Sequence, residues 1–174
     1  MDTKVVNDRI LPDFRIRTFY VAAQKYMDFL KNWIIDEQTA QEAIRLLMSL
    51  YQKVENLPEG SAISCGEPQP KTSNSTPWVN RISFNCQRIY KGILDPFHAE
   101  ELSQLSLAVD LGDIADDLES GISLYETGAF VQAANYWKEA WKAHWGYHAV
   151  AAIRVLHWLK DTEPEPELDE GETE

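Results

Sequence analysis

The segment spanning residues 130–160 constrains the fold most, because its apolar side chains recur at three- and four-residue intervals along its whole length. This spacing is that of one face of an α-helix. The predicted face contains Phe130, Ala133, Ala134, Trp137, Trp141, His148, Ala152, Val155 and Leu159. We therefore expect one long helix in which Trp137, Trp141 and His148 are largely buried.

Four further segments carry the same helical spacing. They cover residues 12–35, 39–57, 78–89 and 110–126. Thr39 and Glu42 predict a capping box at the start of the second of these helices, and a short additional helix is expected over residues 99–107. Gly128 predicts a left-handed turn before the longest helix. Because no stretch alternates as a strand does, the predicted fold is all-α, an antiparallel helical bundle of about five helices.

The chain of 174 residues corresponds to about one domain, which we assign to residues 1–160. Within it, residues 57–76 contain eleven Gly, Pro, Ser or Thr among twenty positions, which predicts a flexible loop. Residues 161–174 hold eight acids and no base, which predicts a disordered acidic tail. Cys65 and Cys86 are two lone thiols, which fit a reducing compartment and cannot form a four-ligand zinc site by themselves.

The formal net charge of −12 arises mostly from this tail, and neither the tail nor the body has a basic excess. Direct nucleic-acid binding is therefore disfavoured, since it requires Lys and Arg to displace phosphate counterions. No apolar run approaches the roughly 20 residues of a membrane span, and the N-terminus has no apolar signal-peptide core. We therefore expect a cytoplasmic protein that does not bind membranes.

The longest predicted helix carries a histidine pair, His144 and His148, one helical turn apart. Histidines at this spacing can bind one metal ion, as they do in zinc enzymes. However, Trp145 stands where the general-base glutamate of the His-Glu-x-x-His motif would be, so a pair of structural core histidines is the simpler interpretation. Further ligands would have to come from Asp113, Asp116 and Asp117. Of these, Asp113 and Asp117 are predicted to face away from the core.

An acidic stretch precedes the long helix, with nine acids and no Lys or Arg from Asp95 to Glu126. On the helix over 110–126, Asp110, Asp113 and Asp117 lie on one polar face, opposite the apolar stripe. Such a face suits a protein partner with a basic segment, and Trp145 is a further candidate contact.

A non-enzymatic protein-interaction module using this face is the leading hypothesis. No cofactor, no bound metal and no complete catalytic set is expected, and neither the partner nor the oligomeric state is predicted. The alternative is a metal-binding protein or metal-dependent enzyme that uses His144 and His148 with a carboxylate from the helix over 110–126.

Several motifs run through the body of the chain. They are LLMSLY at 46–51, NLP at 56–58, Tyr90, Asp95-Pro96, LGDIADDL at 111–118, GISLYETG at 121–128 and HWGYHAVAAIRVLH at 144–157. Over about residues 14–158 the chain resembles an uncharacterised bacterial helical family, domain of unknown function 5063, although Ala115 stands where the family often has an aromatic residue. The resemblance implies an all-helical bacterial cytosolic protein without an assigned activity. Its motif emphasises Asp113, His144, Trp145, Gly146, His148 and His157.

Overall fold

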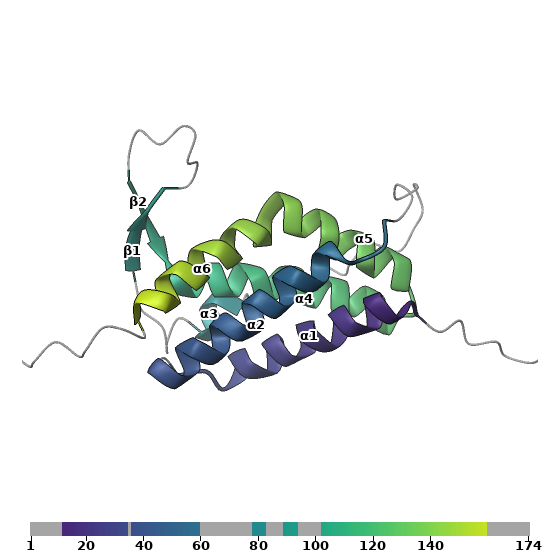
Figure 1. The fold of residues 1–174 in the computed structure, drawn as a ribbon, viewed down its shortest axis with the longest axis horizontal. Coiled ribbons are helices and arrows are strands. Elements are labelled where there is room, and N and C mark those ends of the chain that lie inside the picture. Colours follow the sequence, from purple (N-terminus) through teal and green to yellow (C-terminus); the bar gives the residue numbers. More distant parts are fainter. Residues whose placement is uncertain (1–11, 35, 60–77, 83–88, 94–101, 160–174) are drawn as a thin grey trace, which may run out of the picture.

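The protein is a bundle of antiparallel helices with a small β-hairpin at one end (Figure 1). The structure, a computed structural model, describes residues 12–34, 36–59, 78–82, 89–93 and 102–159. The helices are α1 (Phe14–Lys31), α2 (Glu37–Glu55), α3 (Trp78–Ile82), α4 (Leu107–Glu126), α5 (Phe130–Ala140) and α6 (Gly146–Leu159), with a π-helical turn, η1 (Trp141–Trp145), between the last two. The predicted helical bundle is thus confirmed. In the described part of the chain, no helix is both long and apolar enough to cross a membrane.

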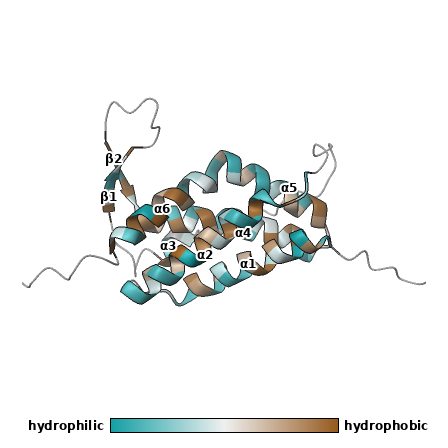
Figure 2. Ribbon diagram, viewed as in Figure 1, coloured by the Kyte–Doolittle hydropathy of each residue, from teal (hydrophilic) through white to brown (hydrophobic). Residues whose placement is uncertain are grey.

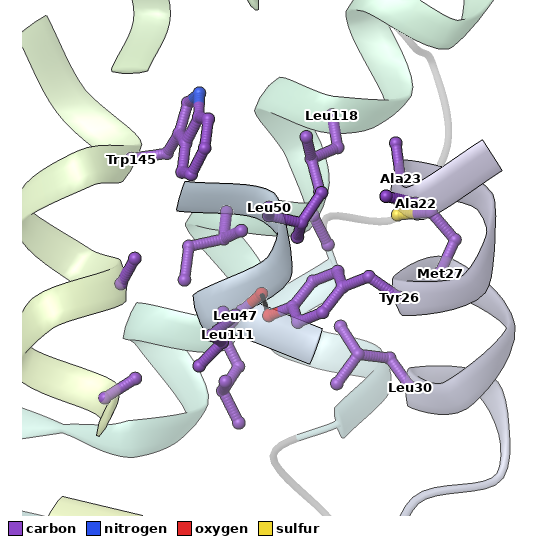
Figure 3. Close-up of a cluster of buried hydrophobic side chains, with 14 of the residues drawn as sticks. Ala22, Ala23, Tyr26, Met27, Leu30, Leu47, Leu50, Leu111, Leu118 and Trp145 are labelled. Carbon is purple, nitrogen blue, oxygen red and sulfur yellow. Dashed lines mark hydrogen bonds between the residues drawn. The ribbon is translucent and has the colours of Figure 1, made fainter. Parts of the chain in front are cut away.

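The apolar faces of the helices meet in one core. Figure 2 shows hydrophobic and hydrophilic residues alternating around the helices, as expected when each helix buries one side. Tyr26 of α1 lies in the centre of this core, where its hydroxyl donates to the carbonyl oxygen of Leu111 at 3.0 Å (Figure 3). This bond satisfies the one polar atom that the Tyr26 side chain brings into the core, and it ties α1 to α4.

The start of α2 differs from the predicted capping box. Asp36, not Thr39, is the N-cap residue, and its side chain accepts a hydrogen bond from the backbone N–H of Thr39. The Thr39 hydroxyl in turn accepts from the backbone N–H of Asp36 at 2.9 Å. The helix therefore begins at Glu37, because an aspartate carboxylate at this position caps the first turn.

The two strands are a second difference. Residues 99–107 were expected to form a helix and Ile89 to lie in one, but β1 (Ile89–Gly92) and β2 (Ser103–Ser106) pair in antiparallel register, with Ile89 opposite Ser106 and Gly92 opposite Ser103. Four-residue strands are too short to show a clear alternation in sequence, and their pairing depends on tertiary contacts. β2 leads directly into α4, so the hairpin stands beside the first turn of that helix.

The π turn η1 changes which residues of 130–160 face the core from those predicted. In an uninterrupted helix Trp145 would lie about 80° away from Trp137, at about 100° per residue. A π turn accommodates one extra residue, which brings Trp145 to within about 20° of Trp137. Trp145 is accordingly fully buried beside Trp137, whereas Trp141 and His148, which were predicted in the core, are only partly buried.

Glycine at position 146 makes this geometry possible. A Cβ atom added there would collide with the carbonyl oxygen of Trp141, and would lie 2.8 Å from Cδ1 of the Trp141 indole. The backbone of α6 thus approaches the π turn more closely than any side chain would allow.

Some of the sequence predictions concern residues outside those that the structure describes. These are most of the predicted loop over 57–76, Cys65, Cys86 and the tail over 161–174.

Because the π turn places Trp145 rather than Trp141 on the buried face, we expect Trp145 to contribute more to stability than Trp141. Replacing the fully buried Trp145 by Ala is expected to lower the free energy of unfolding by about 3–5 kcal/mol. Trp141→Ala should lower it by less. Trp158→Ala is the control, since that indole is 69% exposed and its loss should change stability by no more than about 0.5 kcal/mol. Urea denaturation measures all three, and equal losses for Trp145 and Trp141 would contradict the assignment.

Candidate metal centre

The interface between α4 and the η1–α6 segment brings three carboxylates to two histidines. Asp110, Asp113 and Asp117 recur at three- and four-residue spacing, so they share one face of α4. His144 and His148 face them from η1 and α6, with their ring centroids 4.8 Å apart and their planes inclined by 75°. A row of carboxylates on α4 therefore faces two imidazoles on the η1–α6 segment.

His148 is held by a buried carboxylate. Its Nδ1 lies 2.9 Å from Oδ1 of Asp110, a residue that is only 4% exposed. The hydroxyl of Tyr90, on β1, donates to the other oxygen of Asp110 at 2.6 Å. Accepting the hydrogen bond from Nδ1, Asp110 raises the pKa of His148 above its usual value, against the opposing effect of burial. Burial raises the pKa of Tyr90, and so does its hydrogen bond to Asp110.

His144 repeats the arrangement one turn earlier. Its Nδ1 lies 2.8 Å from Oδ2 of Asp117, and the other oxygen of Asp117 accepts from the hydroxyl of Tyr136 at 3.4 Å. The His144 side chain is 49% exposed and Asp117 is 17% exposed. This half of the site is consequently nearer to solvent than the His148 half.

Asp113 lies between the two rings. Its Oδ2 is 3.4 Å from Nε2 of His148 and 4.0 Å from Nε2 of His144. An ionised carboxylate only accepts hydrogen bonds, so Asp110 and Asp117 favour the proton on Nδ1 of each ring. The Nε2 atom of each ring then faces Asp113, with a lone pair when the ring is neutral and with an N–H when it is protonated.

The distances suit a single metal ion. One donor atom each from Asp113, His144 and His148 lie within 4.8 Å of one another. Donor atoms held at about 2.1 Å by one ion in tetrahedral geometry lie about 3.4 Å apart. The distance between Asp113 and His148 already has this value, whereas the exposed His144 ring has to move about 1 Å closer to the other two donors.

Several predictions about the site residues need correction. Asp113 and Asp117 do not face away from the histidines, because η1 rotates the histidines towards α4. Asp110 is buried rather than part of a solvated face. Asp116 points elsewhere: its Oδ1 accepts from the backbone N–H of Trp78 at 3.3 Å, and burial raises its pKa. Trp145 is fully buried, so it cannot be an exposed contact residue.

The roles of two contributors were not predicted, although the sequence analysis names both Tyr90 and Gly146 among the motifs of the resemblance. Tyr90 completes the hydrogen bonds of Asp110, but it stands twenty residues before Asp110 in a strand that was not predicted. Gly146 allows the turn between the two histidines, and the only sequence signal for its role was its place in the His-Trp-Gly-x-His motif. His157 is exposed near the end of α6 and is not part of the cluster.

A large groove adjoins the histidine pair. Its volume is about 1010 Å³, and His148 and Asp110 form part of its lining. The remaining walls come from the hairpin, the first turn of α4, η1, α6 and one residue of α2. The cluster is therefore next to a space large enough for a small molecule, whose typical sites measure about 300–1,000 Å³.

Comparison with known proteins identifies the family but no activity. The family model described as domain of unknown function (DUF5063) matches residues 12–161, so the chain belongs to that family. The structure resembles the crystal structure of protein BF1032 from Bacteroides fragilis, with a TM-score of 0.68 and 22% sequence identity, covering 86% of this chain and 97% of that one. This likeness concerns the fold. No curated protein matches the chain.

Because Asp110 is buried, we expect the loss of the Tyr90 hydroxyl, its hydrogen-bond donor, to lower the stability of the protein markedly. Tyr90→Phe removes the donor to Oδ2 of Asp110 and should destabilise the protein by about 1–3 kcal/mol, because a buried carboxylate oxygen loses its partner. Tyr147→Phe is the matched control, since that side chain is 69% exposed and should change stability by less than about 0.5 kcal/mol. Chemical denaturation measures both. Equal stability of the two variants would mean that Tyr90 does not hold Asp110.

Proposed function

We propose that this member of the family binds one divalent transition-metal ion through His144, His148 and Asp113. The observation that supports this most is the position of Asp113, whose Oδ2 lies between the Nε2 atoms of both histidines at 3.4 and 4.0 Å. Two imidazole nitrogens and one carboxylate oxygen are a donor set that zinc, iron and manganese accept. Of the two hypotheses that the sequence left open, the geometry therefore favours metal binding.

The two carboxylates that contact Nδ1 of the histidines, Asp110 and Asp117, further support the metal proposal. Metal-binding histidines commonly donate their other ring N–H to a carboxylate, which fixes the tautomer and the ring orientation. Asp110 and Asp117 stand in that relation to His148 and His144, at 2.9 and 2.8 Å. Tyr90 and Tyr136 in turn donate to those two carboxylates. Each of the two histidines is thus backed by a carboxylate and a tyrosine from other elements.

A network of ion pairs without metal is the structural alternative. Protonated histidines could pair with Asp110 and Asp117, and such pairs need nothing more. In that arrangement Asp113 accepts a hydrogen bond from the Nε2–H of a protonated His148. Three carboxylates with two imidazolium ions carry the same net charge as three carboxylates with one divalent ion and two neutral imidazoles, so metal binding itself has to be measured to distinguish the two.

Three protein ligands leave coordination positions open, which is the pattern of catalytic rather than structural sites. A metal held this way can polarise an oxygen of a bound molecule or activate a water molecule. The groove beside His148 offers space for such a molecule. We therefore favour a metal-dependent activity on a small molecule over a purely structural ion.

The hypothesis of an acidic docking face stays a prediction. Asp113 and Asp117 are 30% and 17% exposed, and both are engaged with the histidines. Asp110 is not accessible to a partner. A basic protein segment would have to compete with the two imidazoles for these carboxylates, which is a reason to prefer the metal hypothesis.

Titration calorimetry with Zn²⁺ on the full chain, first freed of metal with a chelator, tests the proposal. We expect one Zn²⁺ per chain. Asp113→Asn should weaken the affinity by more than about 100-fold, and Asp110→Asn, which only orients His148, by about 10–100-fold. Mn²⁺ and Fe²⁺ titrations then rank the metals.

Matched controls come from the same chain. Asp28→Asn changes an exposed carboxylate of α1 that pairs with Lys31, and His157→Ala removes an exposed histidine of α6. Both should bind Zn²⁺ as the wild type does. Circular dichroism confirms that every variant is folded. Zinc binding that survives Asp113→Asn, or that disappears equally in His157→Ala, would refute the site.

A further inference from the structure

We propose that the groove beside His148 binds an elongated anion with an apolar body, and that Arg154 receives its anionic group. The metal contact of this ligand rests on the proposed function, whereas its recognition by the groove does not. The inference comes from the apolar lining of the groove, from the ion pairing of its two cationic side chains and from the position of His148 in its wall.

The lining is mostly apolar and open to solvent. Ile89 and Ile93 from the hairpin segment are 62% and 45% exposed, Val109 of α4 is 40% exposed, and Val150 of α6 is 56% exposed. The Tyr147 ring adds an exposed aromatic surface. These side chains come from separate elements yet border one space of about 1010 Å³. An apolar molecule in this space would remove them from water, which is favourable in proportion to the area covered.

Two cations also line the groove, and only one of them has an ion-pair partner among the described residues. Nζ of Lys142 lies 2.9 Å from a carboxylate oxygen of Glu139. Arg154, by contrast, has no carboxylate within 4.0 Å among the residues that the structure describes. A planar guanidinium is the side chain best suited to a carboxylate or a phosphate group.

Gly92 brings this guanidinium to the hairpin side of the groove. A Cβ atom added at Gly92 would lie 3.0 Å from an Nη atom of Arg154 and 2.7 Å from Cδ1 of Leu105. The absence of a side chain at Gly92 therefore lets Arg154 extend from α6 as far as β1. There it stands close enough to Tyr90 to act electrostatically on its hydroxyl.

The groove lining holds few charged side chains. Inside the groove the only carboxylate of the described lining is Asp110, which is already shared between His148 and Tyr90. Arg154 thus decides where the anionic group lies, and the apolar body extends along α6.

His148 connects the groove with the metal centre. It is part of the groove wall, and its Nε2 faces Asp113. A ligand that occupies the groove consequently lies against one of the proposed metal ligands. Asp113 and His144 are not among the groove-lining residues, so His148 is the link through which the groove would serve as the substrate site of the metal.

The experiment uses octanoate as the probe, with octan-1-ol as the uncharged analogue and acetate as the analogue without an apolar body. Calorimetry on the full, metal-free chain should show octanoate binding at least about tenfold tighter than octan-1-ol, and no acetate binding. Octyl phosphate distinguishes the two kinds of anionic group. Octanoate and octan-1-ol binding equally well would overturn the inference, and so would octanoate failing to bind.

Variants locate the binding. Arg154→Gln should weaken octanoate binding at least about tenfold and leave octan-1-ol binding unchanged. Arg45→Gln is the matched control, since Arg45 lies on α2, pairs with Glu42 and is not part of the groove lining. Val150→Glu, which places a negative charge in the groove, should abolish octanoate binding. Octanoate affinity that is unchanged in both groove variants would contradict the assignment.

The two proposals fail in different ways. If the metal proposal is wrong, Zn²⁺ does not bind, yet metal-free wild type still binds octanoate through Arg154. If the groove proposal is wrong, Zn²⁺ binds and is lost in Asp113→Asn, but octanoate affinity does not depend on Arg154. When both hold, Zn²⁺ tightens octanoate binding several-fold in the wild type, and Asp113→Asn removes this gain while retaining the Arg154-dependent part.

Discussion

The single extra residue in the η1 turn is the constraint on which the rest of the C-terminal half depends. It aligns Trp145 with Trp137, so both indoles reach the core, and each anchors a backbone carbonyl: the Trp137 indole donates to Leu118 and the Trp145 indole to Trp137, both at 3.2 Å. The same turn moves His148 out of the core to its edge. Such π turns inside helices are frequent at functional sites, and here the turn carries one histidine and precedes the other.

The carboxylates of α4 illustrate how a charged helix face can belong to the interior of a fold. Burying Asp110 without partners would be strongly unfavourable, and His148 and Tyr90 supply those partners from two other elements. The hairpin is thereby connected to the helix bundle through the same carboxylate that orients His148. A change in the position of the hairpin would alter both the groove wall and the support of the proposed metal ligand.

Fold and function are separate questions for this family. The likeness to the Bacteroides fragilis protein extends over nearly all of that chain at 22% identity, and it shows that this arrangement of helices is shared. Because one fold can carry unrelated activities, the functional argument has to come from the site itself. Here that argument rests on the convergence of Asp113, His144 and His148 and on the groove that His148 adjoins.

The sequence alone determined the helices, because a three- and four-residue apolar spacing leaves few alternatives for segments of this length. It also determined that His144 and His148 lie one turn apart and that Asp113 and Asp117 share a face. Local spacing could not show that these two faces meet, since a uniform helix was assumed and one π residue rotates everything after it. The short strands and the role of Tyr90 could not be predicted either, because their pairing and hydrogen bonds join residues distant in the chain. Only the packing of α4 against α6 decided that the carboxylates serve the histidines rather than solvent.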